Sequence, residues 1–291
     1  MSFYLTAIIL GLALCALGWG IYLSLRIFNI PDITTDGSYT LGAAIAAVHL
    51  ASGGNWIMAS LLAMLGGAVA GFLTGLIHTR LKVNALLAGI LVMTAAYSVN
   101  LSIMDRSNIA LLQTSNMFST LQLADSEITN SLLILLPLLL LLGAFLVYLL
   151  KSDFGLAMRA TGDAPQMAAS MGIPINAMKI AGLAIANALT GLSGAWVAQY
   201  QNFADINMGI GIVIFGLGAV IIGESIIDLF GKKGIAYRMA GVIIGCLLFR
   251  GVIAASLASG LDPNWLKAVT AALVLVFVSI PRLRAKAMKN D

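Results

Sequence analysis

The sequence carries very little charge. Asp, Glu, Lys and Arg make up 10% of its 291 residues, whereas a soluble domain carries roughly 25%. Apolar residues make up 60% of the chain. The charges stand in short clusters between apolar runs of about 20 residues, the length that crosses the hydrocarbon core of a bilayer. We therefore predict an all-α polytopic membrane protein rather than a soluble enzyme or binding domain.

Residues that build disulfides, metal sites and catalytic centres are also scarce. The two cysteines, Cys15 and Cys246, lie inside apolar runs, and the two histidines belong to no Cys-x-x-Cys or His-Glu-x-x-His pattern. The net charge of +4 does not indicate binding to nucleic acid. We predict no metal site, no catalytic residues and no cofactor in this chain.

A phosphate-binding P-loop is missing as well. The motif needs two glycines five positions apart, followed by Lys and then Ser or Thr. The nearest match is Gly231, but Ile226 stands where the first glycine belongs and Lys233 where the hydroxyl residue belongs. Any ATP chemistry would therefore take place on another chain.

Nine apolar runs predict about nine transmembrane helices. If the loop with Arg80 and Lys82 faces the cytoplasm, 13 of the 16 basic residues fall on that side, Arg106 and Lys267 lie outside, and Arg250 lies within a span. This asymmetry follows the positive-inside rule and predicts an outer N-terminus and a cytoplasmic C-terminus. The runs are 4–27, 38–52, 56–78, 84–104, 131–150, 175–200, 209–227, 238–258 and 264–280. The 13 residues are Arg26, Arg80, Lys82, Lys151, Arg159, Lys179, Lys232, Lys233, Arg238, Arg282, Arg284, Lys286 and Lys289.

Small residues recur at helical spacing in two of these runs. Gly67, Gly71 and Gly75 form one stripe, and Gly241 and Gly245 form another. Such stripes let helix backbones approach closely in lipid, and polar residues within spans form interhelical hydrogen bonds. We therefore interpret the glycines as packing surfaces. We expect most of the polar residues within or at the ends of the spans to form interhelical hydrogen bonds; these residues are Asn84, Asn100, Asn187, Gln199 and Gln201.

The segment 151–174 is one of the two longest polar stretches of the chain, and the predicted topology places it in the cytoplasm. We expect Asp163 to cap a helix over 164–171. Pro165 would lie in its first turn, Gln166 would take the reciprocal position of a capping box, and Gly172 would end the helix. Two interpretations fit this helix. Its apolar stripe could enter a groove of a partner protein, or the segment could rest on lipid headgroups through Lys151 and Arg159. The stripe consists of Met167 and Met171.

A polar segment, Asn29–Ser38, separates the first two apolar runs. Non-helical polar backbone at membrane depth requires protein or a water-filled cavity to satisfy it. One interpretation is a broken helix that lines a solute path, with Tyr97 and Asn100 as further path residues. The other is a cytoplasmic turn in which Asp36 or Ser38 caps the following span. The path residues in this segment would be Asp32, Thr34, Thr35, Asp36, Gly37 and Ser38.

Three charged residues lie within or at the end of apolar runs. Glu224 and Asp228 are four positions apart and share a helix face, which makes them functional candidates because an unpaired intramembrane charge is costly. A salt bridge to Arg238 or Lys232 is the structural alternative. Arg250 could extend toward the membrane surface or pair with a carboxylate.

Several motifs together resemble a known family. FGLAMRATGDAPQMAASMGI, followed by the small-residue span GLAIANALTGLSGAWVA, resembles the cytoplasmic coupling segment of ATP-binding-cassette importer permeases of the ribose and branched-chain amino acid type. IPDITTDGSYTLGAA at 30–44 and GLGAVIIGESI at 216–226 match two further motifs of that family. Together with LLAGILVMTAAYSVNLSIM at 86–104, they are most similar to the tryptophan/tyrosine-type subgroup.

The resemblance implies a single transmembrane permease domain over 1–291 in the bacterial cytoplasmic membrane. It implies a homodimer, two cytoplasmic ATPase subunits that hold ATP and Mg²⁺, and an extracytoplasmic binding protein that delivers a small organic solute, with an aromatic amino acid expected. The ATPase would be coupled through Gly155, Arg159, Asp163, Gln166, Met167, Met171 and Gly172.

Two other classes of protein are the alternatives. An ion-coupled secondary transporter would show paired midplane carboxylates and broken helices repeated in two halves, whereas the sequence shows one break and no visible repeat. A membrane-embedded enzyme would need clustered catalytic side chains, and none stand out.

Overall fold

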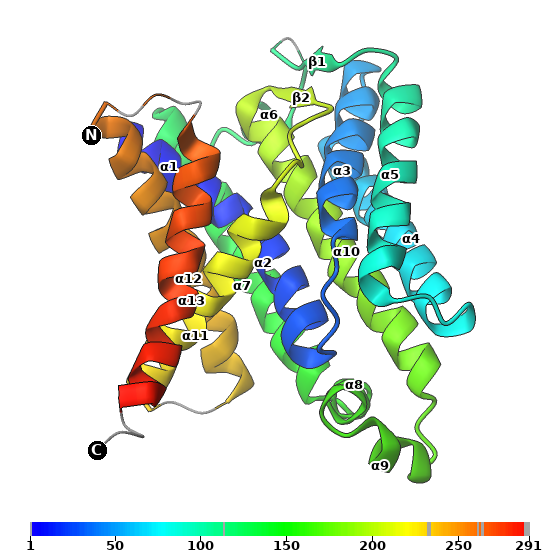
Figure 1. Ribbon diagram of the computed structural model, residues 1–291. Helices are drawn as coiled ribbons and strands as arrows, with labels where there is room; N and C mark the ends of the chain where they lie inside the picture. The colour runs from blue at the N-terminus through cyan, green and yellow to red at the C-terminus, as the bar shows by residue number, and fades with distance from the viewer. Residues whose placement is uncertain (1, 113, 232–233, 261, 263–264, 288–291) are drawn as a thin grey trace.

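The chain folds into a bundle of long helices joined by short connections (Figure 1). The computed structural model describes all residues except 1, 113, 232–233, 261, 263–264 and 288–291. The first half consists of α1 (Ser2–Ala13), α2 (Cys15–Tyr22), the π-helical turn η1 (Leu23–Ile27), α3 (Thr34–Ala51), α4 (Trp56–Arg80), α5 (Ala85–Met104), β1 (Asn108–Ala110), α6 (Met117–Thr120) and α7 (Glu127–Lys151). The second half consists of α8 (Asp153–Asp163), α9 (Pro165–Ser170), α10 (Ile175–Gln201), β2 (Phe203–Asp205), α11 (Ile212–Leu229), α12 (Ile235–Ala258) and α13 (Leu266–Ala287).

The predicted helical membrane fold is confirmed in its main features. Six helices among the described residues are long and apolar enough to cross a bilayer: α4, α5, α7, α10, α11 and α12. The first apolar run makes a seventh if its two halves form one span, since they bend by 41° between Ala13 and Cys15. Of the other two predicted spans, 38–52 corresponds to α3 and 264–280 to α13.

The break predicted over 29–38 is shorter than expected. Helix α3 begins at Thr34, so only residues 28–33 are non-helical. The backbone N–H of Thr34 donates to Asp32 Oδ1 over 2.9 Å, and Thr35 Oγ1 donates to the carbonyl of Asp32 over 3.1 Å. The first of these bonds satisfies one of the N–H groups that a helix start otherwise leaves unpaired. The expectation of a broken helix through Thr34–Ser38 was therefore wrong, and the bent helix lies in the first run instead.

Helix α10 forms the centre of one half of the bundle. Of the residues in the most apolar stretch of α10, 78% are buried inside the bundle. The corresponding share for α7, at the periphery, is 22%. Helix α10 packs most extensively against α4 and α3. The predicted glycine stripe makes the α4 contact, because a Cβ on Gly67 or Gly71 would collide with the α10 backbone. The packing interpretation of the stripe is thus confirmed.

Helices α11 and α12 pair in the same way in the other half. A Cβ on Gly245 would collide with the carbonyl of Ala219, and Gly223 meets the backbone of Gly241. The second predicted stripe is therefore also a backbone contact between two helices.

The two ends of the bundle differ in structure. At one end β1 and β2 pair antiparallel, with Ile109 opposite Ala204, and α6 lies beside them. Helices α8 and α9 lie at the opposite end (Figure 1). Helix α1 begins at the β1–β2 end and α13 finishes at the α8–α9 end.

The segment 151–174 contains two helices where one was expected. Ser152 caps α8, since its Oγ accepts a 3.4 Å hydrogen bond from the N–H of Gly155. Asp163 is the last residue of α8 and Ala164 precedes α9 without a side-chain cap, so the predicted cap by Asp163 was wrong. Pro165 at the first position of α9 is as predicted. Gly172 follows α9 with φ of +83°, a conformation that favours glycine.

Candidate functional site: a solute cavity and a coupling surface

Buried hydrogen bonds fasten the start of α3 to two neighbouring helices. Asn187 of α10 donates from Nδ2 to Asp32 Oδ2 over 2.6 Å, and Ser38 Oγ donates to Asn187 Oδ1 over 2.7 Å. Thr34 Oγ1 lies 2.7 Å from Thr74 Oγ1 of α4. All of these side chains are buried. The predicted interhelical role of Asn187 is confirmed, whereas Thr74 gave no signal because a lone threonine is common in a span.

Asp36 joins the start of α3 to the start of α11. Its Oδ2 accepts a hydrogen bond from the N–H of Gly211 and its Oδ1 accepts one from the N–H of Val213, each over 2.9 Å. A carboxylate is favourable at a helix N-terminus. Asp36 therefore caps α11, a helix 175 positions away, and not its own span as the alternative interpretation had it.

Gly37 and Asn100 lie at the contact between α3 and α5. A Cβ on Gly37 would stand 3.1 Å from Met93 Cα and from Ala96 Cβ. Asn100 is buried, with its Nδ2 at 3.5 Å from the carbonyl oxygen of Gly37. Tyr97 lies on the exposed side of α5 instead. The structure brings Gly37 and Asn100 together and places Tyr97 apart from them.

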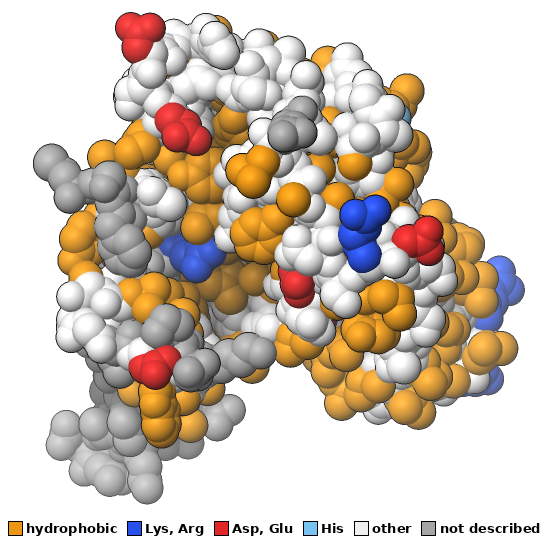
Figure 2. Space-filling model, turned by 90° about the horizontal axis from the view of Figure 1, so that it is seen from above, with side chains coloured by type: hydrophobic (Ala, Val, Ile, Leu, Met, Phe, Trp, Pro, Cys, Tyr) orange, Lys and Arg blue, Asp and Glu red, His pale blue; other side chains and the backbone are white. Residues whose placement is uncertain are grey.

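Two adjoining cavities lie beside Arg250 of α12. The first is bordered by α3, α10 and β2, and the second by α11, α12 and α13. They have volumes of about 360 and 380 Å³, and both are lined by Leu14, Ile212 and Arg250. Viewed from above, the β1–β2 end of the molecule is hollowed, with hydrophobic side chains and a basic side chain visible in the hollow (Figure 2). The first cavity also holds the polar side chains of Tyr39, Gln201, Asp205 and Asn207, and the second is mostly apolar.

Arg250 has no carboxylate partner in the part of the chain that the structure describes. Its Nε is buried and lacks a hydrogen-bond partner there, and the ion pairs found among the described residues all involve Glu224. Of the two interpretations of Arg250, pairing with a carboxylate is therefore not observed among the described residues, and its side chain borders both cavities.

Glu224 forms a charge cluster at the end of the bundle that carries α8. It pairs with Arg26, and its Oε1 lies 3.6 Å from Nη1 of Arg238. The predicted salt bridge to Arg238 is confirmed. Arg26 was missed because it belongs to a distant run, and Lys232 lies outside the described residues. Asp228 is exposed, so it does not share the buried environment of Glu224.

Helix α8 contacts this cluster and the end of the first helix run. Arg159 lines a cavity of about 320 Å³ together with Arg26 and Arg238. A Cβ on Gly162 would collide with the carbonyl of Ile27. Gly155 makes a similar close approach to the carbonyl of Leu149 at the end of α7. Movement of α8 would therefore act directly on the η1 and α7 backbones.

Two exposed methionines stand at α9, Met167 within the helix and Met171 directly after it. Met167 and Met171 are 64% and 71% exposed, and Gln166 and Asp163 are exposed beside them. Ala168 faces inward and is buried. The predicted methionine face is thus largely exposed and available to a partner.

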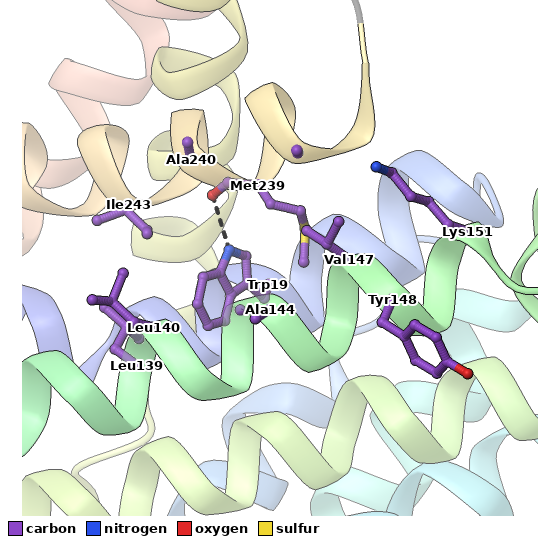
Figure 3. Close-up of a pocket in the computed structure, with 12 residues that line it drawn as sticks. Trp19, Leu139, Leu140, Ala144, Val147, Tyr148, Lys151, Met239, Ala240 and Ile243 are labelled. Carbon is purple, nitrogen blue, oxygen red and sulfur yellow. Dashed lines mark hydrogen bonds between the residues drawn. The ribbon is translucent and has the colours of Figure 1, made fainter.

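A further cavity of about 470 Å³ surrounds Trp19 between α7 and α12 (Figure 3). The indole Nε1–H of Trp19 donates to the carbonyl of Met239 over 3.0 Å. The lining is otherwise apolar except for Lys151 and the hydroxyl of Tyr148. Because the indole donor is already bonded, this cavity suits hydrocarbon better than a polar solute.

A family model described as the permease component of a branched-chain amino acid transport system matches residues 1–279. The chain belongs to this permease family. The family membership identifies an integral membrane component of a transport system rather than an enzyme.

Curated relatives cover nearly all of this permease. A tyrosine transport system permease protein of Clostridioides difficile is 36% identical over 291 residues, which is 100% of this chain and 95% of that protein. An uncharacterised protein of Rickettsia prowazekii is 33% identical over 288 residues, 98% of this chain and 99% of that protein. An autoinducer 2 import system permease protein of Photorhabdus laumondii is 27% identical over 263 residues, 89% of this chain and 75% of that protein. No solved structure gives a significant match.

Proposed function

We propose that this permease is the membrane subunit of an ATP-binding-cassette importer for an aromatic amino acid. The observation that carries the proposal is the full-length similarity to the tyrosine transport system permease protein. Two copies of the permease would work with two cytoplasmic ATPases, which hold ATP and Mg²⁺, and with an extracytoplasmic binding protein. The permease itself would carry out no covalent chemistry.

The proposed topology has nine spans in the bacterial cytoplasmic membrane. They are the six long helices, the bent α1–α2 pair, α3 and α13. A polar helix such as α3 is tolerated within a membrane when protein encloses it, and α3 packs against α10, α4 and α5. The basic asymmetry places the β1–β2 end outside and the α8–α9 end in the cytoplasm.

The proposed coupling surface consists of α8 and α9. The ATPase would bind the methionine face of α9, where Met167 and Met171 offer apolar contact area. The displacement of α8 would then reach the membrane helices in two ways. One is the backbone contact of Gly162 with Ile27, and the other is the Arg159 cavity beside the Glu224 ion pairs.

The start of α3 would shape the solute path without binding the solute tightly. Asp32, Thr34 and Ser38 already bond to α10 and α4. Their proposed role is to fix one wall of the path, while Asp36 links that wall to α11. Thr35 and Gly37 belong to the same turn, and Tyr97 and Asn100 would continue the path along α5.

Reconstitution tests the proposed function. The permease is incorporated into proteoliposomes together with its ATPase and binding protein, and uptake of radiolabelled L-tyrosine and L-tryptophan is followed with and without ATP. We expect ATP-dependent uptake, with ribose as a solute that is not accumulated. Uptake driven by an ion gradient in the absence of the ATPase would contradict the proposal.

A further inference from the structure

We propose that Arg250 binds the carboxylate of the transported solute within the permease, while Asp205 faces the solute's ammonium group. In this arrangement the apolar cavity beside Arg250 receives the solute's side chain. The inference rests on the proposed function and specifies the chemistry of the solute: a zwitterionic amino acid with a large apolar or aromatic side chain.

The first reason is the unpaired Nε of the Arg250 guanidinium. A charged side chain within a membrane helix is costly and is normally paired. The buried carboxylate groups at Asp32 and Glu224 have partners, whereas Nε of Arg250 has none in the described part of the chain. The planar guanidinium fork matches a carboxylate in two parallel hydrogen bonds. A solute carboxylate would therefore supply what Arg250 lacks.

The second reason is an opposite charge in the same cavity. Asp205, at the end of β2, lines the cavity of about 360 Å³ together with Arg250, but the two are not joined by an ion pair among the described residues. Asp205 Oδ1 accepts a hydrogen bond from the N–H of Asn207 over 2.8 Å, which orients the carboxylate. A cation and an anion that line one space without meeting suit a zwitterion between them.

The third reason is the composition of the adjoining cavity. It has a volume of about 380 Å³ and shares Arg250 with the polar cavity. Its other lining includes Ile214, Phe215, Ile253 and Leu266. Ligand sites for small molecules are typically about 300–1,000 Å³ and mostly apolar, with a few polar groups that fix orientation. The two cavities together meet that description for one amino acid.

The position of the cavities fits delivery from a binding protein. The polar cavity is lined by Phe203 and Asp205 of β2. The β1–β2 end is hollowed (Figure 2), and the proposed topology places it outside the cell. Gly211 lines the apolar cavity, and its N–H is held by Asp36 of α3. Closing this site would therefore be transmitted to the start of α3.

Arginine modification with protection by ligands tests the site directly. Phenylglyoxal is applied to the full permease in nanodiscs, and modification of each arginine is followed by peptide mass spectrometry. We expect L-tyrosine to slow modification of Arg250 several-fold. Tyramine, which lacks the carboxylate, should give no protection, and 3-(4-hydroxyphenyl)propionate, which lacks the ammonium group, should give less than tyrosine. The exposed Arg106 serves as the internal control and should react equally in all samples.

Two results would overturn the inference. One is equal protection by L-tyrosine and tyramine, or no protection by either. The other is a complete lack of reaction at Arg250 in the unliganded permease, because an open cavity must admit the reagent.

Variants in the assembled transporter separate this inference from the proposed function. Arg250→Gln should raise KM for L-tyrosine about tenfold, as expected when one charge-assisted pair is lost. Arg250→Lys should recover part of that loss, and Arg106→Gln should have no effect. Normal KM in a folded Arg250→Gln transporter would refute the site and leave the proposed function standing. Protection of Arg250 by L-tyrosine in a transporter that accumulates no amino acid would support the site and refute the proposed function.

Discussion

The carboxylate of Asp36 accepts a 2.9 Å hydrogen bond from the backbone N–H of Val213, a residue 177 positions further along the chain. This bond fixes the first turn of α11 to the first turns of α3. The Asp36 side chain thus fixes the positions of two segments, the starts of α3 and α11, that both border the proposed solute route.

Replacing Asp36 should weaken the attachment of α3 to the start of α11. Asp36→Asn retains the size of the side chain but removes one of its two acceptor oxygens, so we expect about 1–2 kcal/mol lower stability and a clear loss of uptake. Thermal unfolding in detergent and uptake in proteoliposomes measure the two effects. Asp228→Asn, at the exposed end of α11, is the matched control and should change neither. An Asp36→Asn transporter with the original uptake rate would show that the α3–α11 bond is dispensable.

Gly37→Val should separate α3 from α5. The new side chain would press on Met93 and Ala96, which a Cβ already approaches to 3.1 Å. We expect lower uptake with a smaller change in expression, and destabilisation of about 1–3 kcal/mol from overpacking. Gly251→Ala in α12, where a Cβ meets nothing within 4 Å, should be neutral or slightly stabilising. Equal behaviour of the two variants would contradict the close packing of α3 on α5.

The methionine face of α9 should govern binding of the ATPase. Met167→Ser together with Met171→Ser should weaken copurification of the ATPase several-fold while leaving the melting temperature unchanged, since both side chains are exposed. Leu112→Ser, at the opposite end of the bundle and 81% exposed, is the control for loss of exposed apolar surface. If both variants retain the ATPase equally, α9 is a surface connector resting on headgroups.

Gly162→Val should uncouple ATP hydrolysis from transport. A side chain at this position would collide with the carbonyl of Ile27, so α8 could no longer seat against η1. We expect ATPase association to persist while solute uptake per ATP hydrolysed falls. Ala157→Val, on the same helix and only half-buried, provides the comparison. A normal ratio of uptake to hydrolysis in the glycine variant would contradict transmission through this contact.

Cysteine labelling tests the orientation. Cys15 and Cys246 are first replaced by alanine, so that the label reports on the cysteines introduced afterwards. A cysteine at position 153 should react with an impermeant reagent only from the cytoplasmic side, and one at position 125 only from outside. Labelling of position 153 in intact cells would reverse the proposed topology.

The apolar runs predicted the long helices well, because hydrocarbon-spanning segments are defined by composition and length. The ends of the helices were harder to place. Thr34 and Asp36 look like loop residues by polarity, yet their groups are satisfied by Thr74 and by the start of α11, which only the folded chain brings near. For the same reason the sequence did not indicate Arg26 as the partner of Glu224, since the two residues are brought together only in the folded chain.

The coupling segment shows a second limit. A proline and a glycine marked α9 correctly, whereas the cap at Ser152 and the tight turn at Gly155 that begin α8 depend on contact with the end of α7. Cavities such as the one beside Arg250 are harder still to predict. They arise where packed helices leave space between them, and the pattern of apolar residues in the sequence does not show where that happens.

The glycine contacts of α4 with α10 have a mechanical consequence. Backbone rests on backbone at Gly67 and Gly71, so no layer of side chains lies between the two helices that could yield when force is applied. We expect α4 and α10 to move as one rigid body during transport, and the same holds for α11 and α12 through Gly223 and Gly245. Helix α3 packs on α4 and α10, and its Asp36 is hydrogen-bonded to the start of α11. Relative motion of the two bodies would therefore have to change that contact.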